Sequence, residues 1–433
     1  LTERDGYAVV EQIIPGGAAD RLGVLEPKDK IIAVAEEGQS SVDVIDMALR
    51  DVVRLIRGKK GTRVDLTILR QGEKTERFQV AIQRDTIDLT QQAAKLSFET
   101  VVVNDRKLKI AVLDLPSFYG DQDPSKRKGS RDVARLLQQA RNSDADGLIL
   151  DLSRNGGGLL EDAVAISGFF ISEGGIVAVK ESDDNQGRVM EDPDDGILFN
   201  GPMVILVSRW SASASEILAG ALKDYGRALI VGDDHTFGKG TVQSVFPLRP
   251  GLGALKITTA LFFRPGGTST QNSGVAADVM FPSLLNTDAF GERHKRHSLS
   301  AQPIPPFRSD EANGDDATTQ WDPVTRQMVA VLAGRSKRRV LEDDYFQEIA
   351  KELAERESDD GVVRLAEIIR EREEANGRRG SSEDGAPETG ETGSANADTA
   401  GLAVPKDPEE DADPSPQIRE ALEILTDMIT LSP

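Results

Sequence analysis

Short apolar segments alternate with helical segments between residues 109 and 231, and this alternation constrains the fold more than any other feature of the chain. The apolar segments are rich in Ile, Leu and Val and short enough to be buried strands, at 109–115, 147–152, 203–207 and 229–231. Apolar residues at helical spacing predict helices at 129–142, 159–170 and 213–224. Strands alternating with helices indicate a layered α/β core.

The strand at 203–207 leads into Ser211-Ala-Ser213-Ala-Ser215-Glu216, which begins the helix at 213–224. A serine there lies beside the free N–H groups of the first helical turn, where the helix dipole favours the oxyanion that forms during acyl transfer. Ser213 is therefore a candidate nucleophile. The pattern Ser213-x-x-Glu216 is also a capping box, so a purely structural helix cap is the alternative.

A candidate base follows in Thr236-Phe-Gly-Lys239-Gly-Thr-Val-Gln243, one helix and one strand later. A lysine can act as a base only if its pKa falls by roughly three units from ~10.4, which requires burial away from carboxylates. Lys239 has glycines on both sides and apolar residues nearby, and Gln243 could hold its amine by a hydrogen bond. A surface lysine in a turn is the alternative.

A third motif is the strand Gly147-Leu-Ile-Leu-Asp-Leu152 followed by Ser-Arg-Asn-Gly-Gly157-Gly158-Leu159. A strand that passes through glycines into a helix leaves backbone N–H groups exposed at the turn, where a substrate can approach closely. A plain glycine-rich turn is the alternative. The G-x-G-x-x-G spacing of a dinucleotide site is absent.

These motifs together resemble the active-site segments of the C-terminal processing (tail-specific) proteases. The resemblance implies that Ser213 is the nucleophile and Lys239 the general base, supported by Gln243. It implies an oxyanion site formed by the residues Gly157, Gly158 and Ala214. Asp224 matches a family aspartate that is sometimes given a supporting role, although its place late in a helix is also that of a surface acid. The spacing of 26 residues between Ser213 and Lys239 is one longer than the family pattern, and the turn at 232–235 can hold the extra residue.

The same resemblance implies a crotonase/ClpP-like layered fold, protein or peptide substrates with apolar C-termini, an exported location such as the periplasm, and no metal or organic cofactor. A membrane-associated adaptor or substrate is compatible with that location. The sequence has no apolar stretch long enough to span a bilayer and no signal peptide at its beginning. The oligomeric state is left open.

Residues 1–87 predict a separate PDZ domain, truncated at its N-terminus. Strands are expected near 7–13, 30–34 and 64–68, with a helix at 43–57 whose apolar face carries Ile45, Leu49, Val52 and Ile56. The order and the Ile-Pro-Gly-Gly-Ala-Ala motif resemble bacterial PDZ domains, which bind peptide C-termini by strand addition. The carboxylate-binding loop is expected before Leu1, and Lys28 stands where a glycine is expected.

The resulting domain prediction has the catalytic core at 88–300 and a helical region at 301–375. An acidic linker rich in Gly, Ser and Pro at 376–416 is predicted to be disordered, and a final helix is predicted at 417–433.

Composition excludes several kinds of partner and catalytic group. A net charge of −21 makes nucleic acid an unsuitable partner, and the lack of cysteine excludes a thiol nucleophile and disulfides. A Ser/His triad through His235 is the alternative to Lys239, but the histidine has no clear orienting partner. Two other functions compete with proteolysis: a catalytically silent scaffold that binds C-termini, and a crotonase-like acyl enzyme.

Overall fold

The computed structural model describes most of the chain outside a long segment near the C-terminus. The described residues are 1–4, 6–10, 13, 17–26, 28–71, 75–85, 93–120, 127–181, 187–192, 196–249, 252–286, 290–295, 297–317, 319–358 and 414–431. The linker predicted at 376–416 lies outside these residues except for its last three. The domain boundaries drawn from the sequence remain predictions.

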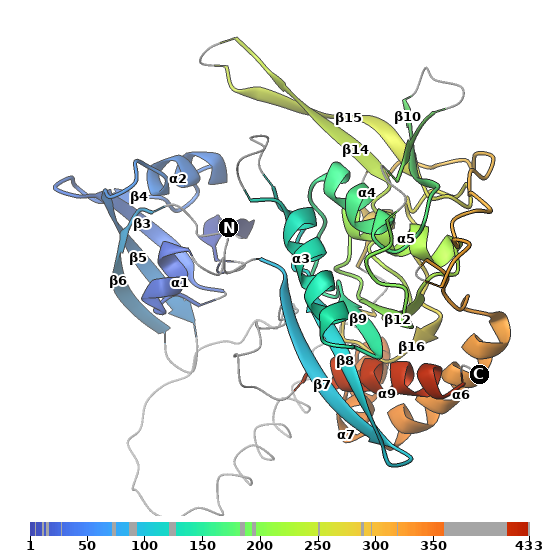
Figure 1. Cartoon of the computed structure of the whole chain (residues 1–433). Helices are drawn as coiled ribbons and strands as arrows, with labels where there is room; N and C mark the ends of the chain where they lie inside the picture. Colours follow the sequence, from blue (N-terminus) through green and yellow to red (C-terminus); the bar gives the residue numbers. More distant parts are fainter. Residues whose placement is uncertain are drawn as a thin grey trace, which may run out of the picture.

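The N-terminal unit is a sheet with two short helices (Figure 1). The strand order is β1-β2-β3-β5-β6, with β4 paired to β3. The elements are β1 Thr2–Arg4, β2 Tyr7–Val9, α1 Ala18–Leu22, β3 Lys30–Glu36, β4 Val42–Asp43, α2 Leu49–Ile56, β5 Arg63–Gln71 and β6 Thr75–Gln83. The alternation predicted at 64–68 is confirmed, because Val64, Leu66 and Ile68 are buried in one hydrophobic cluster.

The helix expected at 43–57 begins later than the sequence predicted. Residues 42–43 form β4 instead, and α2 begins only at Leu49. The Asp43 carboxylate accepts a hydrogen bond from the Ile45 amide at 2.9 Å, which favours a turn over a helix. Asp46 has a φ of 59°, which a right-handed helix does not allow. Ile45 therefore does not share a helical face with Val52.

Lys28, which stands where a glycine was expected, adopts a glycine-like backbone conformation with a φ of 79°. Its amide donates a hydrogen bond of 2.7 Å to the Val10 carbonyl oxygen, so the turn into β3 is held although the residue is unfavourable.

The core is built on a six-stranded sheet in the order β16-β13-β12-β9-β8-β7. Neighbouring strands are parallel from β16 through β8, and β7 joins β8 as an antiparallel hairpin. The strands are β7 Lys95–Val103, β8 Arg106–Asp114, β9 Gly147–Asp151, β12 Met203–Val207, β13 Leu229–Gly232 and β16 Val279–Met280. The helices between them are α3 Gly129–Asn142, α4 Leu160–Gly168 and α5 Ala214–Asp224. The predicted mixed α/β fold is confirmed.

Alternate side chains of the central strands enter two different hydrophobic clusters, so the sheet is covered on both faces. In β12, Met203, Ile205 and Val207 pack with residues of α3, α4 and α5. Val204 and Leu206 instead pack with residues of the C-terminal helices. The core therefore has three layers, which explains why its strands are apolar without alternation.

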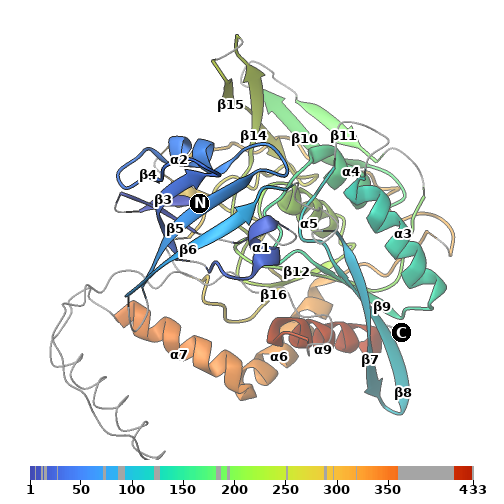
Figure 2. The same cartoon turned by 90° about the vertical axis from the view of Figure 1, so that its left-hand side faces the viewer.

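The C-terminal helices complete the third layer. They are α6 Arg326–Glu342, α7 Asp344–Ser358 and α9 Pro416–Leu431, and the helical C-terminal region is confirmed. Figure 2 shows α7, α6 and α9 along one side of the core. Arg339 of α6 forms ion pairs with Glu420 and Asp427 of α9, which joins segments more than 80 residues apart. None of the described helices is both long and apolar enough to cross a membrane.

A second core sheet has four strands in the order β11-β10-β15-β14. They are β10 Gly175–Glu181, β11 Arg188–Glu191, β14 Thr241–Pro247 and β15 Ala254–Phe263, and the short 3-10 helix η1 Glu292–His294 follows. Strands β14 and β15 form a long hairpin that projects from the body of the core (Figure 1).

Candidate active site

Ser213 lies at the junction between β12 and α5, with a backbone conformation that an ordinary helix cap does not have. Its φ and ψ are 59° and −110°. Such a conformation costs a residue other than glycine about 1–3 kcal/mol and is typical of functional sites. The capping box with Glu216 is present, and the Ser213 amide donates to Glu216 Oε2 at 2.8 Å. The structural cap and the candidate nucleophile are therefore the same residue.

The fully buried Glu216 carboxylate joins Ser213 to the segment that carries Lys239. Its Oε2 atom accepts hydrogen bonds from the amides of Ser213 at 2.8 Å and Lys239 at 2.9 Å. Its Oε1 atom accepts from the Thr236 hydroxyl at 2.6 Å and the Gly238 amide at 2.7 Å. Because one oxygen holds both amides, the backbones of the candidate nucleophile and base lie next to each other.

Burial disfavours the charged forms of both Glu216 and Lys239. Burial raises the pKa of Glu216 to about 7, although its four hydrogen bonds act in the opposite direction. Burial also lowers the pKa of Lys239, and the like charges of Lys256 and Lys295 lower it further, while Glu292 and Glu216 oppose this. The shift of Lys239 is in the direction that a general base requires.

The glycine turn after β9 lies directly against Ser213. A β-carbon added at Gly157, whose φ is 107°, would lie 2.9 Å from the Ser213 Cβ atom. One added at Gly158 would lie 2.1 Å from the Phe118 carbonyl oxygen. Phe118 holds the turn in place, because its amide donates to the Gly157 carbonyl oxygen at 3.0 Å and its carbonyl oxygen accepts from the Leu159 amide at 2.9 Å. Both glycines are therefore required by close packing.

Asn155 connects this turn to the nucleophile segment. Its side chain donates to the Leu115 carbonyl oxygen at 2.8 Å and accepts from the Gly157 amide at 2.8 Å. Its backbone carbonyl oxygen accepts from the Ser215 hydroxyl at 2.7 Å and the Ala212 amide at 3.2 Å. The Gly157 N–H is thus already engaged within the turn.

Two other predicted site residues lie farther from this cluster. Gln243 is an exposed residue of β14, directly after a bulge in the ladder with β15, and it forms no hydrogen bond with Lys239 among the described residues. Asp224 is the last residue of α5, whereas Ser213 caps its first turn. The Asp224 carboxylate accepts hydrogen bonds from the Arg264 guanidinium and from the Gly266 amide at 2.8 Å. Its contacts therefore hold the segment after β15.

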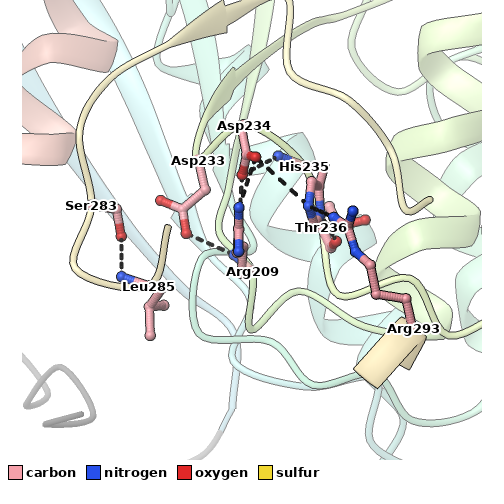
Figure 3. A network of polar contacts seen from close by, with 8 residues as sticks. All are labelled: Arg209, Asp233, Asp234, His235, Thr236, Ser283, Leu285 and Arg293. Carbon is pink, nitrogen blue, oxygen red and sulfur yellow. Dashed lines mark hydrogen bonds and ion pairs between the residues drawn. The ribbon is translucent and has the colours of Figure 1, made fainter. Parts of the chain in front are cut away.

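A polar network holds the turn at 232–235, where the sequence placed the extra residue (Figure 3). Arg209 follows β12 and lies between two aspartates that follow β13. Its amide donates to Asp233 Oδ2 at 2.8 Å, and its guanidinium forms two hydrogen bonds of 2.8 Å with the Asp234 carboxylate. Burial raises the pKa of Asp233 to about 6. The network joins the segment after β12, which leads to Ser213, to the segment after β13, which leads to Lys239.

His235 belongs to this network rather than to a triad with Ser213. One ring nitrogen contacts the Arg293 guanidinium, and the other contacts the Thr236 carbonyl oxygen. Figure 3 shows Arg293 approaching the ring from the segment of η1. Since both nitrogens have these partners, the ring is not directed at a serine hydroxyl.

Comparison with known proteins identifies two domains in the chain. The family model "Peptidase family S41" matches residues 109–281, and the model "PDZ domain" matches residues 2–69. The chain contains a PDZ domain followed by a family S41 peptidase domain. The matched S41 segment includes Ser213, Glu216 and Lys239, together with the glycine turn at 157–158.

Relatives of both domains are known. The chain is 39% identical over 312 residues to the "Tail-specific protease" of Haemophilus influenzae, covering 70% of this chain and 43% of the relative. It is 31% identical over 280 residues to "Carboxyl-terminal-processing peptidase 2, chloroplastic" of Arabidopsis thaliana, covering 65% and 51%. The chain thus spans about half the length of these relatives. The solved "Photosystem II D1 C-terminal processing protease" is 29% identical, with a TM-score of 0.45, and the match covers 65% of this chain and 70% of that one.

Sequence reasoning missed several residues of the S41 domain's site. Glu216 was recognised only as half of a capping box, although its carboxylate also holds the segment of Lys239. Asn155 and Arg209 were not singled out. Apart from the hydrogen bond between Asn155 and Gly157, their contacts described above span 24 to 60 residues along the chain, so local spacing does not reveal them.

Proposed function

We propose that this chain is a serine endopeptidase that uses a Ser213/Lys239 dyad to process or degrade proteins recognised by apolar C-terminal residues. The observation that carries the proposal is the buried Glu216 carboxylate, which holds the amides of both dyad residues on one oxygen. The S41 family match and the lowered pKa of Lys239 support the same chemistry.

The first half-reaction forms an acyl-enzyme. The neutral Lys239 amine takes the proton from Ser213 Oγ as this oxygen bonds to the scissile carbonyl carbon. The carbonyl oxygen becomes an oxyanion, which the amides of Gly158 and Ala214 stabilise by hydrogen bonds. The C–N bond then breaks, and the Lys239 ammonium gives its proton to the leaving amine.

Hydrolysis of the ester completes the cycle. Lys239 takes a proton from a water molecule as the water oxygen bonds to the acyl carbon. The ester C–O bond breaks and the proton passes to Ser213 Oγ, which regenerates the neutral amine and the serine hydroxyl. Each half-reaction begins with an uncharged Lys239, so the cations Lys256 and Lys295 favour the reaction by lowering its pKa.

The PDZ domain supplies a place for the substrate's C-terminus in this proposal. Among the described strands β1 lies at one edge of its sheet, and an extended peptide can add to an edge strand. Apolar recognition is part of the proposal, as is an exported location. Cell fractionation that finds the protein in the cytoplasm would contradict the location.

Degradation of an unfolded protein ending in apolar residues tests the proposal. Ser213→Ala removes the nucleophile, and Lys239→Arg keeps a positive charge but cannot act as a base near neutral pH. Both changes are expected to abolish cleavage, while the matched change Lys107→Arg at an exposed lysine of β8 leaves it intact. Full activity in Lys239→Arg would refute the dyad. Binding of the apolar tail without cleavage by the unmodified protein would indicate a binding protein instead.

A further inference from the structure

The hairpin of β14 and β15 exposes six large apolar side chains. We call the described residues 241–249 and 252–259 the arm. Its exposed apolar residues, with their exposed fractions, are Val245 61%, Phe246 46%, Leu248 47%, Leu252 68%, Leu255 49% and Ile257 40%. Figure 1 shows the arm projecting away from the helices and from the other sheet of the core. Grouped apolar exposure of this kind marks a binding surface.

Both faces of the arm carry these side chains. Residues paired across an antiparallel ladder share a face, so Phe246 and Leu255 lie on one face with Ile257. Val245 and Lys256 are paired on the opposite face. A flat contact with a second copy of the chain would bury only one of these faces. A strand added beside β14 would place its own alternate side chains against both.

The outer edge of the arm is open to such an addition. β14 is the last strand of its sheet, and its sequence from Thr241 to Pro247 has no charged residue. Exposed edges are usually protected by charges, bulges or proline. In β14 the bulge lies at the beginning, between Val242 and Gln243, and the proline lies at the far end. Among the described strands, none pairs with the edge between them.

Charge and position indicate what kind of chain fits this edge. The segment from 236 to 277 contains no Asp or Glu, although the protein has a net charge of −21. Its cations are Lys239, Arg249, Lys256 and Arg264. The arm therefore does not repel an apolar polypeptide that carries acidic residues. β14 also begins two residues after Lys239, so its edge is continuous with the candidate active site.

We propose that the edge of β14 receives an extended apolar segment of the polypeptide substrate by strand addition, beyond the residues that flank the scissile bond. The inference rests on the proposed peptidase function. Seven residues of strand span roughly 20 Å, so only substrates that extend several residues from the cleaved bond reach the arm. A short substrate is cleaved without it.

The test compares two substrates in the full chain: a chromogenic tetrapeptide and an unfolded protein ending in apolar residues. Val245→Lys places a charge on the edge, and Val245→Thr keeps the shape while removing the apolar character. The matched control is Val102→Lys, because Val102 on the β7–β8 hairpin is also 61% exposed. Val245→Lys is expected to lower kcat/KM for the long substrate at least tenfold, mainly through KM, with a smaller loss in Val245→Thr. The tetrapeptide rate and the control are expected to be unchanged.

Three results would overturn the inference. Unchanged cleavage of the long substrate in Val245→Lys would show that the arm does not bind the substrate. An equal loss with both substrates would show that the arm acts on the dyad instead. A dimer in sedimentation that Val245→Lys dissociates, with normal degradation, would assign the arm to contact between copies. Failure of the peptidase proposal is distinguishable from these, because the unmodified protein would then cleave neither substrate.

Discussion

Replacing Glu216 with glutamine should disconnect the candidate nucleophile from its base while leaving the volume of the side chain unchanged. The carboxylate accepts four hydrogen bonds, two on each oxygen. Glutamine keeps one acceptor oxygen, and its NH₂ group faces two donors that it cannot satisfy. Two charge-assisted bonds are lost, at about 1.5–3 kcal/mol each, or about 3–6 kcal/mol in all.

Part of this energy lowers the free energy of unfolding, and part raises the reaction barrier because Ser213 and Lys239 are no longer held in place. A contribution of about 3 kcal/mol to the barrier corresponds to about a 100-fold decrease in rate. We therefore expect kcat for the tetrapeptide to fall by about 100-fold or more in Glu216→Gln. The control is Glu420→Gln, which removes a buried carboxylate that pairs with Arg339 on the far side of the sheet. The control should lower thermal stability without lowering kcat.

The pH dependence provides a second readout. The folded protein binds the Glu216 proton more tightly than the unfolded chain does, because burial raises its pKa from 4.5 to about 7. The contribution of this group to stability therefore falls as pH rises from 4.5 to about 7. Four acceptor bonds require the ionised form, so activity should rise as the pH passes through about 7, where Glu216 ionises in the folded protein. In Glu216→Gln the acid limb of the kcat/KM profile should lose one ionisation near pH 7. A decrease of less than threefold in kcat, or an unchanged acid limb, would refute the proposed role of the carboxylate.

Other predictions concern the backbone and the packing of the core. Lys28→Gly should stabilise the PDZ domain by about 1–2 kcal/mol, since glycine adopts the φ of 79° without strain, and urea unfolding that shows no gain would contradict this. Gly157→Ala should abolish cleavage, because the added β-carbon would lie 2.9 Å from the Ser213 Cβ atom, and near-normal kcat would show that the turn can move away. Leu425→Ala in α9 should cost about 2–5 kcal/mol, because this buried side chain packs against Gly147 of the central sheet, and a thermal melt unchanged from that of the unmodified protein would argue against the third layer.

Local patterns in the sequence were sufficient for the elements that carry the candidate residues. The apolar run before Ser213, the capping box and the helical spacing of the next eleven residues predicted β12 and α5, because each depends only on neighbours along the chain. The glycines at 157 and 158 predicted a tight turn for the same reason. At residues 43–46 the helical spacing of apolar residues competed with the tendency of aspartate to form turns, as Asp43 and Asp46 do. The predicted helix therefore began too early.

Contacts between distant segments could not be predicted in this way. The Glu216 carboxylate reaches the Lys239 amide only because β13 lies beside β12, and Asn155 reaches Ser215 only because β9 lies on the other side. The same holds for α9, whose packing on the sheet depends on a chain segment that returns after many residues. The sequence alone determined the class of fold, the strand and helix at the nucleophile and the residue types of the site. The tertiary structure decided which of these residues meet, because spacing along the chain reports which face of an element is buried but not which segment buries it.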